Sequence, residues 1–203
     1  MRLPVLDRED NSSMDYTQHN SMVDCFLEQS FTYFDTAYMY RSFKSGIALR
    51  EALVKRHDRD SFTVAAKRPV VMLKKAEDME RIFNEQLEKT GVEYFDYYLL
   101  HNLGVAHYAI AEKLDTFSFV AGKKAEGNVV KMGFSFHDTA DLLDEILTAH
   151  PEVDFVQLQI NYLDWDNETY SQASATRWQN AWQAGCSHGA YKRRYAGTGS
   201  RGG

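Results

Sequence analysis

The sequence predicts an α/β fold, a partial (β/α)8 TIM barrel in which about five parallel βα units are retained. Two observations carry this prediction. Short runs rich in Val, Ile, Phe and Tyr recur about every thirty residues, as strands do when helices separate them. The longer segments between these runs place apolar side chains at helical spacing. Strands and helices that alternate in this way form parallel βαβ units, either in a barrel or in an open doubly wound sheet.

The elements follow one another along the chain in a regular order. Strands are expected at residues 31–36, 62–67, 94–100, 129–136 and 154–160. Helices are expected between them, at residues 45–56, 79–87, 110–125 and 142–147. The last helix follows a capping candidate at Asp138 or Thr139. No glycine-rich phosphate-binding loop follows the first strand, which favours the barrel over the doubly wound sheet.

The composition of the chain changes after Tyr170. Residues 171–203 contain no Val, Ile, Leu, Met, Phe, Asp or Glu. A segment without aliphatic side chains buries too little apolar surface to offset the entropy that it loses on ordering. We therefore expect a barrel-like region over residues 1–170 and, over residues 171–203, a tail that is disordered or results from a change of reading frame.

The charge balance excludes several classes of function. The 203 residues include 23 basic and 29 acidic side chains, for a net charge of −6, which gives no electrostatic footprint for nucleic acid or an anionic membrane. No signal peptide is visible, and no apolar run approaches the ~18 residues that a membrane span needs. The two cysteines, Cys25 and Cys186, do not suggest a metal site by their spacing. We expect a cytoplasmic protein with a small-molecule substrate, without metal, nucleic-acid or membrane partners.

Four polar residues lie at or just after the ends of the first three expected strands. Asp35 and Tyr40 follow the first strand, Lys67 ends the second and His101 ends the third. Active groups of a barrel of this kind lie at the carboxyl ends of its strands. A phenol has an ordinary pKa of about 10, and a nearby ammonium such as that of Lys67 lowers it toward neutrality. Asp35 is suited to hold Lys67, and His101 to orient a substrate carbonyl or to share the proton with Tyr40.

Several stretches of the chain resemble the aldo/keto reductase family. The resemblance covers residues 1–170 and rests on the strings YFDTA at 33–37, YFDYYLLH at 94–101, GFS at 133–135 and QLQINY at 157–162. It implies hydride transfer between NADPH and a small carbonyl substrate, with Tyr40 as the general acid and Asp35, Lys67 and His101 completing a catalytic tetrad. It also implies that Ser135 and Gln157 bind the nicotinamide carboxamide. The family often has Asn directly after that serine, where Phe136 and His137 stand here.

The amino-acid sequence at residues 2–4, 134–138 and 161–165 is most similar to that of the subgroup with a C-terminal iron–sulfur region. The present chain lacks a cysteine cluster for such a centre, so no iron–sulfur cluster is expected. By the family's pattern the five strands match the second to the sixth of eight, so the resemblance implies a truncated barrel. Two alternatives follow. One is an inactive remnant that aggregates or pairs with another protein through its exposed sheet edges. The other keeps the barrel but uses Lys67 as a Schiff-base nucleophile.

Overall fold

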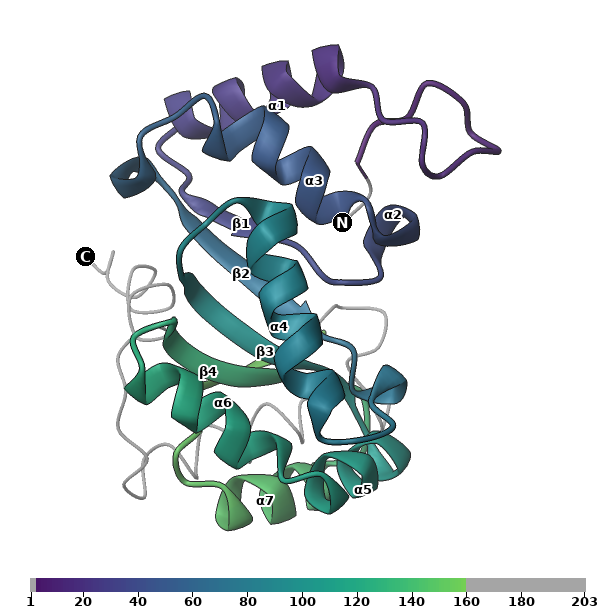
Figure 1. Cartoon of the computed structure of the whole chain (residues 1–203), viewed down its shortest axis with the longest axis vertical. Coiled ribbons are helices and arrows are strands. Elements are labelled where there is room, and N and C mark those ends of the chain that lie inside the picture. The colour runs from purple at the N-terminus through teal and green to yellow at the C-terminus, as the bar shows by residue number, and fades with distance from the viewer. Residues whose placement is uncertain (1–2, 160–203) are drawn as a thin grey trace, which may run out of the picture.

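The computed structural model describes residues 3–159, and its centre is a parallel sheet of five strands in the order β1-β2-β3-β4-β5 (Figure 1). All four neighbouring pairs are parallel. The strands are β1 (Tyr33–Asp35), β2 (Thr63–Arg68), β3 (Phe95–Leu103), β4 (Val129–Phe136) and β5 (Phe155–Leu158). Together they form a curled half-barrel, so the predicted partial barrel is confirmed.

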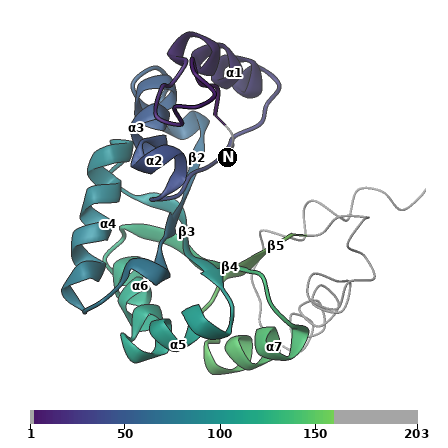
Figure 2. The same ribbon diagram turned by 90° about the vertical axis from the view of Figure 1, so that its right-hand side faces the viewer.

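Helices connect the strands and lie along the outer face of the curled sheet (Figure 2). Between the strands lie α3 (Ser45–Leu49), α4 (Glu77–Thr90), α5 (Val105–Lys113), α6 (Thr116–Ala125) and α7 (Ala140–Ala149), and α1 (Tyr16–Glu28) precedes β1. The short segment α2 (Tyr40–Phe43) is a single turn with non-helical backbone angles at Arg41 and Ser42. A π-helical turn, Arg50–Val54, continues α3, and short 3-10 turns are present at Arg59–Ser61 and Val70–Met72. Crossover helices on the outer face are what a right-handed βαβ connection between parallel strands produces.

The strand predictions agree with the structure to within three residues at each described end, but two helix predictions need correction and one helix was missed. The helix expected over residues 110–125 is two helices, because Asp115 has a left-handed backbone with φ 53° that separates α5 from α6. The helix expected over residues 45–56 becomes π-helical in its second half. Helix α1 was not predicted.

The capping candidates before α7 also have unexpected roles. Thr139 is the N-cap residue by position but its side chain makes no capping hydrogen bond. Asp138 instead accepts hydrogen bonds from the backbone N–H of Thr139 at 2.8 Å and, in the first turn of α5, of Val105 at 3.0 Å. The carboxylate of Asp138 therefore satisfies one of the unpaired backbone donors at the start of a different helix, α5.

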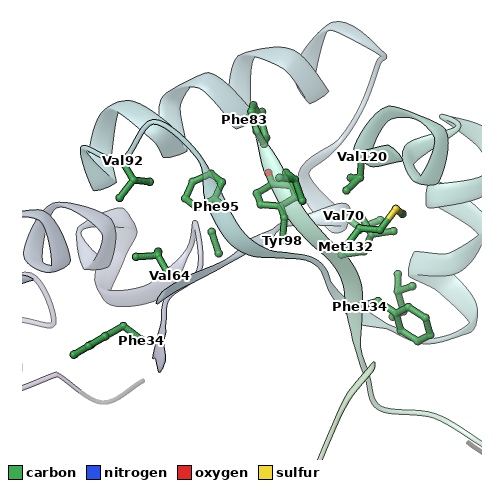
Figure 3. Packing of buried hydrophobic residues seen from close by; sticks show 14 of the residues in the cluster. Phe34, Val64, Val70, Phe83, Val92, Phe95, Tyr98, Val120, Met132 and Phe134 are labelled. Carbon is green, nitrogen blue, oxygen red and sulfur yellow. The ribbon is translucent and has the colours of Figure 1, made fainter. Parts of the chain in front are cut away.

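The main hydrophobic core lies between the sheet and its helices (Figure 3). From the strands, Val64, Tyr98 and Phe134 are fully buried and point toward the helices. Phe83 of α4 contacts Tyr98 edge-on with ring centroids 5.1 Å apart, and Val120 of α6 packs beside them. This alternation, with one side chain facing the helices and the next facing the inside of the curl, is the period of a parallel strand.

The inner face of the sheet is lined by half-buried aromatic rings that contact one another across the strands. Tyr33 of β1 and Tyr97 of β3 meet edge-to-face at 5.3 Å, and Tyr97 meets Phe155 of β5 at 5.4 Å. Gly133 makes room for this row, since a Cβ atom there would lie 2.4 Å from the carbonyl oxygen of Phe155 and 2.7 Å from its ring. The glycine thus lets β5 approach β4 closely.

The expected boundary after Tyr170, the tail over residues 171–203 and the last residue of the fifth expected strand lie outside the described residues. Within residues 3–159, no helix is long and apolar enough to cross a membrane.

Candidate active site

The carboxyl ends of the strands gather the polar residues that the sequence singles out. Asp35 is the last residue of β1, and Ser135 and Gln157 face each other in the register of β4 and β5. Lys67 and His101 lie near the ends of β2 and β3. Because the strands are parallel, their carboxyl ends meet at one edge of the sheet, and side chains two residues apart share the inner face. The fold therefore places these five side chains at one end of the half-barrel.

Lys67 lies at the centre of the site. Its ammonium donates hydrogen bonds to Asp35 Oδ1 at 2.7 Å and to the hydroxyl of Tyr40 at 3.3 Å. Only 6% of the Lys67 side chain is exposed, against 22% for Asp35. A buried ammonium needs a charged partner, and Asp35 supplies it. The phenol of Tyr40 consequently lies next to a fixed positive charge.

Gln157 reaches the same carboxylate from the far end of the sheet. Its amide nitrogen donates to Asp35 Oδ2 at 3.3 Å, so each oxygen of Asp35 accepts one hydrogen bond, from Lys67 or from Gln157. The sequence predicted Gln157 as a cofactor ligand and gave no sign of this contact. It arises because the sheet curls until its first and last described strands face each other.

His101 lies beside Tyr40 in a largely buried position. The two rings meet edge-on with centroids 5.6 Å apart. The pKa of His101 is lowered from 6.5 to about 4, mainly by burial and then by the positive charge of Lys67, which outweighs the opposing effect of the Asp35 carboxylate. His101 is therefore a neutral imidazole near pH 7. A neutral imidazole can donate one hydrogen bond to a carbonyl oxygen from its N–H, but it lacks the second, acidic proton of an imidazolium.

Ser135 is buried beside the irregular end of β3, where the pairing with β4 shifts register between Leu100 and Leu103. Its hydroxyl oxygen accepts a hydrogen bond of 2.7 Å from the backbone N–H of Asn102, whose φ is 60°. Asparagine tolerates this left-handed conformation better than most residues do. The hydroxyl hydrogen of Ser135 remains a donor for another group. No sequence motif marks Asn102, which fixes the position of Ser135 through its main chain.

His137 is a second residue near the site that motif reasoning did not assign. Its backbone N–H continues the pairing of β4 with β3 by donating to the carbonyl of Leu103 at 3.1 Å. Burial, followed by the charge of Lys67, lowers the pKa of its imidazole. His137 is thus close enough to Lys67 for the ammonium charge to act on its imidazole. In the sequence, only the departure from the family pattern at this position pointed to His137.

The loop that carries Tyr40 is fixed to the sheet and to α3. The backbone N–H of Tyr38 donates to the carbonyl of Lys67 at 3.2 Å, which extends the pairing of β1 with β2. The hydroxyls of Thr36 and Ser45 share a buried hydrogen bond of 2.8 Å. Within residues 3–159, no three His, Cys, Asp or Glu side chains gather as a metal site would require. The described chemistry of the site is therefore that of a phenol, an ammonium, a carboxylate and a neutral imidazole.

Comparison with known proteins gives the family of the chain. The model of the aldo/keto reductase family matches residues 6–176. A search of curated proteins found no match. Among solved structures, an aldo-keto reductase from Klebsiella pneumoniae in complex with NADPH has a TM-score of 0.56 and 22% identity, over 74% of this chain and 51% of that one.

Two further bacterial structures share the fold. The holo form of an aldo-keto reductase from Bacillus halodurans has a TM-score of 0.59 and 20% identity, over 74% of this chain and 51% of that one. A protein from Pseudomonas aeruginosa, described as an aldo-keto reductase, has a TM-score of 0.70 and 18% identity, over 90% of this chain and 66% of that one. The chain spans about half the length of the first two structures. Since the family model matches most of its residues, the chain belongs to the aldo/keto reductase family.

Proposed function

We propose that this chain acts as an oxidoreductase that transfers hydride between NADPH and a small carbonyl substrate, with Tyr40 as the general acid. The observation that carries the proposal is the buried ammonium of Lys67, which bridges the carboxylate of Asp35 and the hydroxyl of Tyr40. When a carbonyl becomes an alcohol, its oxygen must gain a proton. A phenol whose conjugate base is stabilised by an adjacent ammonium is suited to deliver that proton.

The residues at the ends of β4 and β5 fit the carboxamide of a nicotinamide cofactor. A carboxamide offers both a donor and an acceptor, and so needs one of each in return. Ser135 retains its hydroxyl hydrogen as a donor, and Gln157 retains the carbonyl oxygen of its side chain as an acceptor. NADPH, when bound, supplies the hydride. Ser135 and Gln157 would hold its carboxamide, as the family resemblance implies.

The remaining residues bind and orient the substrate oxygen. His101 is neutral near pH 7, so we assign it a hydrogen bond to the carbonyl rather than the transfer of a proton. Tyr40 then gives its proton to that oxygen, and the Lys67 ammonium stabilises the phenolate that remains. Asp35 keeps Lys67 in place throughout. This assignment favours Tyr40 over His101 as the acid.

The Schiff-base alternative requires a different state of Lys67. A lysine attacks a carbonyl as a neutral amine with a free electron pair. Lys67 instead lies 2.7 Å from a carboxylate and donates to a phenol, a pair of contacts suited to an ammonium. We therefore prefer the reductase to an aldolase-like reaction.

We further propose that the chain is related to the subgroup of the family with a C-terminal iron–sulfur region. The amino-acid sequence at residues 134–138 and 161–165 supports this relationship. Iron and sulfide analysis of the purified chain tests the companion expectation that it binds no cluster. A bound cluster would contradict that expectation. The cytoplasmic location and a protein partner at the edges of the sheet stay predictions.

Isotope transfer tests the proposed reaction. The purified chain is incubated with small aldehydes and ketones and with NADPH that carries deuterium at the transferable position of its nicotinamide. We expect alcohol products with deuterium on the former carbonyl carbon. Tyr40→Phe should lower the rate by about 10²- to 10⁴-fold. Tyr94→Phe is the matched control, since Tyr94 lies at the opposite end of β3 beneath the guanidinium of Arg59. An unlabelled alcohol, or equal loss in both variants, would contradict the proposal.

A further inference from the structure

The backbone directly after Tyr40 has a conformation that L-amino acids rarely adopt. Arg41, Ser42 and Phe43 are consecutive non-glycine residues with φ angles of 51°, 50° and 68°. In this left-handed region the Cβ atom comes too close to the neighbouring carbonyl oxygen, so each of the three residues raises the free energy of the loop. Such a conformation persists only when surrounding contacts hold it.

Arg41 makes the contacts that hold one side of this loop. Its guanidinium donates to Asn11 Oδ1 at 2.8 Å and to the main-chain carbonyl of Leu3. Two separate bonds from one planar group fix the direction of the side chain as well as its position. Both partners belong to a single segment, residues 3–14, which is more than 25 positions away along the chain.

Residues 3–14 are themselves anchored, so they can serve as a support. Val5 and Met14 form an isolated antiparallel bridge that closes the segment into a hairpin. Leu3 and Met14 are buried and pack against Ala48 of α3. The hairpin is thus attached to the helix that follows the Tyr40 loop, and Arg41 links the hairpin back to the loop.

The other side of the loop is held by a second set of contacts on α4. The ring of Phe43 meets that of Tyr38 edge-on at 5.3 Å. Tyr38 donates a hydrogen bond of 2.7 Å to Glu85, and the ammonium of Lys89 lies over both rings, 4.9 Å from that of Tyr38 and 5.8 Å from that of Phe43. Tyr40 therefore stands between two attachment points, one at Tyr38 and one at Arg41.

We propose that Arg41 is a positioning residue for Tyr40, and that its bonds to the hairpin of residues 3–14 hold the strained turn that presents the phenol to Lys67. The inference rests on the proposed role of Tyr40 as the general acid. The hydrogen bond between Tyr40 and Lys67 is 3.3 Å long, so a shift of the loop by about 1 Å breaks it and removes the proton donor from the site.

An alternative role for Arg41 makes a different prediction. The guanidinium could act on Tyr40 through its charge alone, without regard to the backbone. Replacing Ser42 by glycine separates the two roles, because glycine adopts a left-handed conformation without steric cost. Ser42 is exposed. If Arg41 acts by holding the turn, Ser42→Gly should compensate for its loss, whereas a lost charge is not replaced by glycine.

The test measures carbonyl reduction and backbone hydrogen exchange in Arg41→Ala, Arg41→Lys, Asn11→Ala and Arg41→Ala/Ser42→Gly. We expect kcat to fall on the order of tenfold in Arg41→Ala with the KM for NADPH unchanged, and less in Arg41→Lys and Asn11→Ala, which each retain one bond. The double variant should return to within about threefold of the wild-type kcat. The N–H of Lys44 donates to the carbonyl of Arg41 at 3.0 Å. Its rate of hydrogen exchange should rise in the variants that lose kcat and return toward the wild-type rate in the double variant.

Arg56→Ala is the matched control. Arg56, like Arg41, donates both to a side-chain oxygen, here a carboxylate oxygen of Asp24, and to the main chain, at the carbonyls of Ala52 and Asn20, but it lies outside the Tyr40 loop. It should change neither kcat nor exchange at Lys44. Asn11→Ala keeps the test decisive if Arg41→Ala does not fold, because Asn11 is exposed and lies outside the loop. Failure of glycine to restore both kcat and exchange would overturn the proposal.

Hydrogen exchange separates this inference from the proposed function. If the wild-type chain reduces no carbonyl but Lys44 exchange still responds to Arg41→Ala and recovers with Ser42→Gly, the turn is held as described and the reductase assignment is at fault. If the wild type is active and neither measurement responds to Arg41→Ala, the reductase assignment stands and Arg41 is not a positioning residue.

Discussion

Gln157 donates a hydrogen bond to Asp35 across 122 positions of sequence and across the whole width of the described sheet. Asp35 ends β1 and Gln157 lies in β5, the two outermost strands of that sheet. Their contact at 3.3 Å is possible only because five strands curl far enough for the two edges to face each other. The half-barrel is thus closed at its active end by side chains.

The double role of Gln157 leads to the first prediction. Gln157→Met removes the amide while keeping a side chain of similar length, so both the bond to Asp35 and the proposed carboxamide contact are lost. We expect the Kd for NADPH to rise about tenfold and the free energy of unfolding to fall by about 1 kcal/mol. Fluorescence titration and urea unfolding measure the two effects. Gln159→Met, which changes an exposed glutamine two residues further on, should alter neither.

The pair of Asp35 and Lys67 should be unequal in its effect on stability. Asp35→Asn leaves the ammonium of Lys67 buried without a countercharge, whereas Lys67→Met leaves Asp35 22% exposed and bonded to Gln157. We expect Asp35→Asn to lower the free energy of unfolding by about 3 kcal/mol and Lys67→Met to lower it less. Urea unfolding of both single variants and of the double variant measures this. Additive losses in the double variant would show that the two charges do not stabilise each other.

Much of this architecture is readable from the sequence for a simple reason. The strands are runs of aromatic and β-branched residues buried against helices, and burial on the outer face of a parallel sheet requires such runs. The order of Asp35, Lys67 and His101 at successive strand ends then follows from strand direction alone. Local composition and one general rule about parallel strands were sufficient for both.

Protonation of His101 should make the fold sensitive to acid. The pKa of His101 in the folded chain is about 4, against 6.5 ordinarily, so the unfolded chain binds its proton first as the pH falls. The contribution of neutral His101 to the free energy of unfolding is therefore complete above pH 6.5 and is lost as the pH falls from 6.5 to about 4. Urea unfolding at pH 7 and at pH 4.5 measures how far the free energy of unfolding falls between the two pH values. We expect this fall to be smaller in His101→Gln than in the wild type by up to about 3 kcal/mol. Residual pH dependence should remain from His19 and His137, whose pKa values are also lowered by burial. An unchanged pH dependence in His101→Gln would contradict the assignment of a buried neutral imidazole.

Gly133 should tolerate no side chain. In Gly133→Ala the new Cβ meets the backbone of Phe155 at 2.4 Å, so β5 must move and carry Gln157 with it. We expect a loss of stability of about 3 kcal/mol and weaker NADPH binding. Gly122→Ala is the control: nothing lies within 4 Å of a Cβ at this position in α6, and alanine should stabilise the helix by about 0.5 to 1 kcal/mol. Thermal unfolding compares the two. Equal stability of both variants would mean that β4 and β5 are not packed as described.

The features that the sequence did not reveal depend on distant contacts. The bond between Gln157 and Asp35 depends on how far five strands curl, which no local pattern encodes. The left-handed turn at Arg41 contradicts local preference, and its support comes from residues 3–14. Asn102 acts through its main chain, so its side chain leaves no motif. The break at Asp115 is likewise a backbone feature, at a single residue inside a segment whose composition is otherwise helical.

The most direct test of the central claim is a fluorescence titration of NADPH into the purified, folded chain and into Tyr40→Phe and Gln157→Met. We predict saturable binding to the wild type, equal affinity in Tyr40→Phe because the phenol acts on the substrate, and about tenfold weaker binding in Gln157→Met. Absence of binding to the folded wild-type chain, or the same affinity in Gln157→Met as in the wild type, would contradict the placement of a nicotinamide site at the ends of β4 and β5.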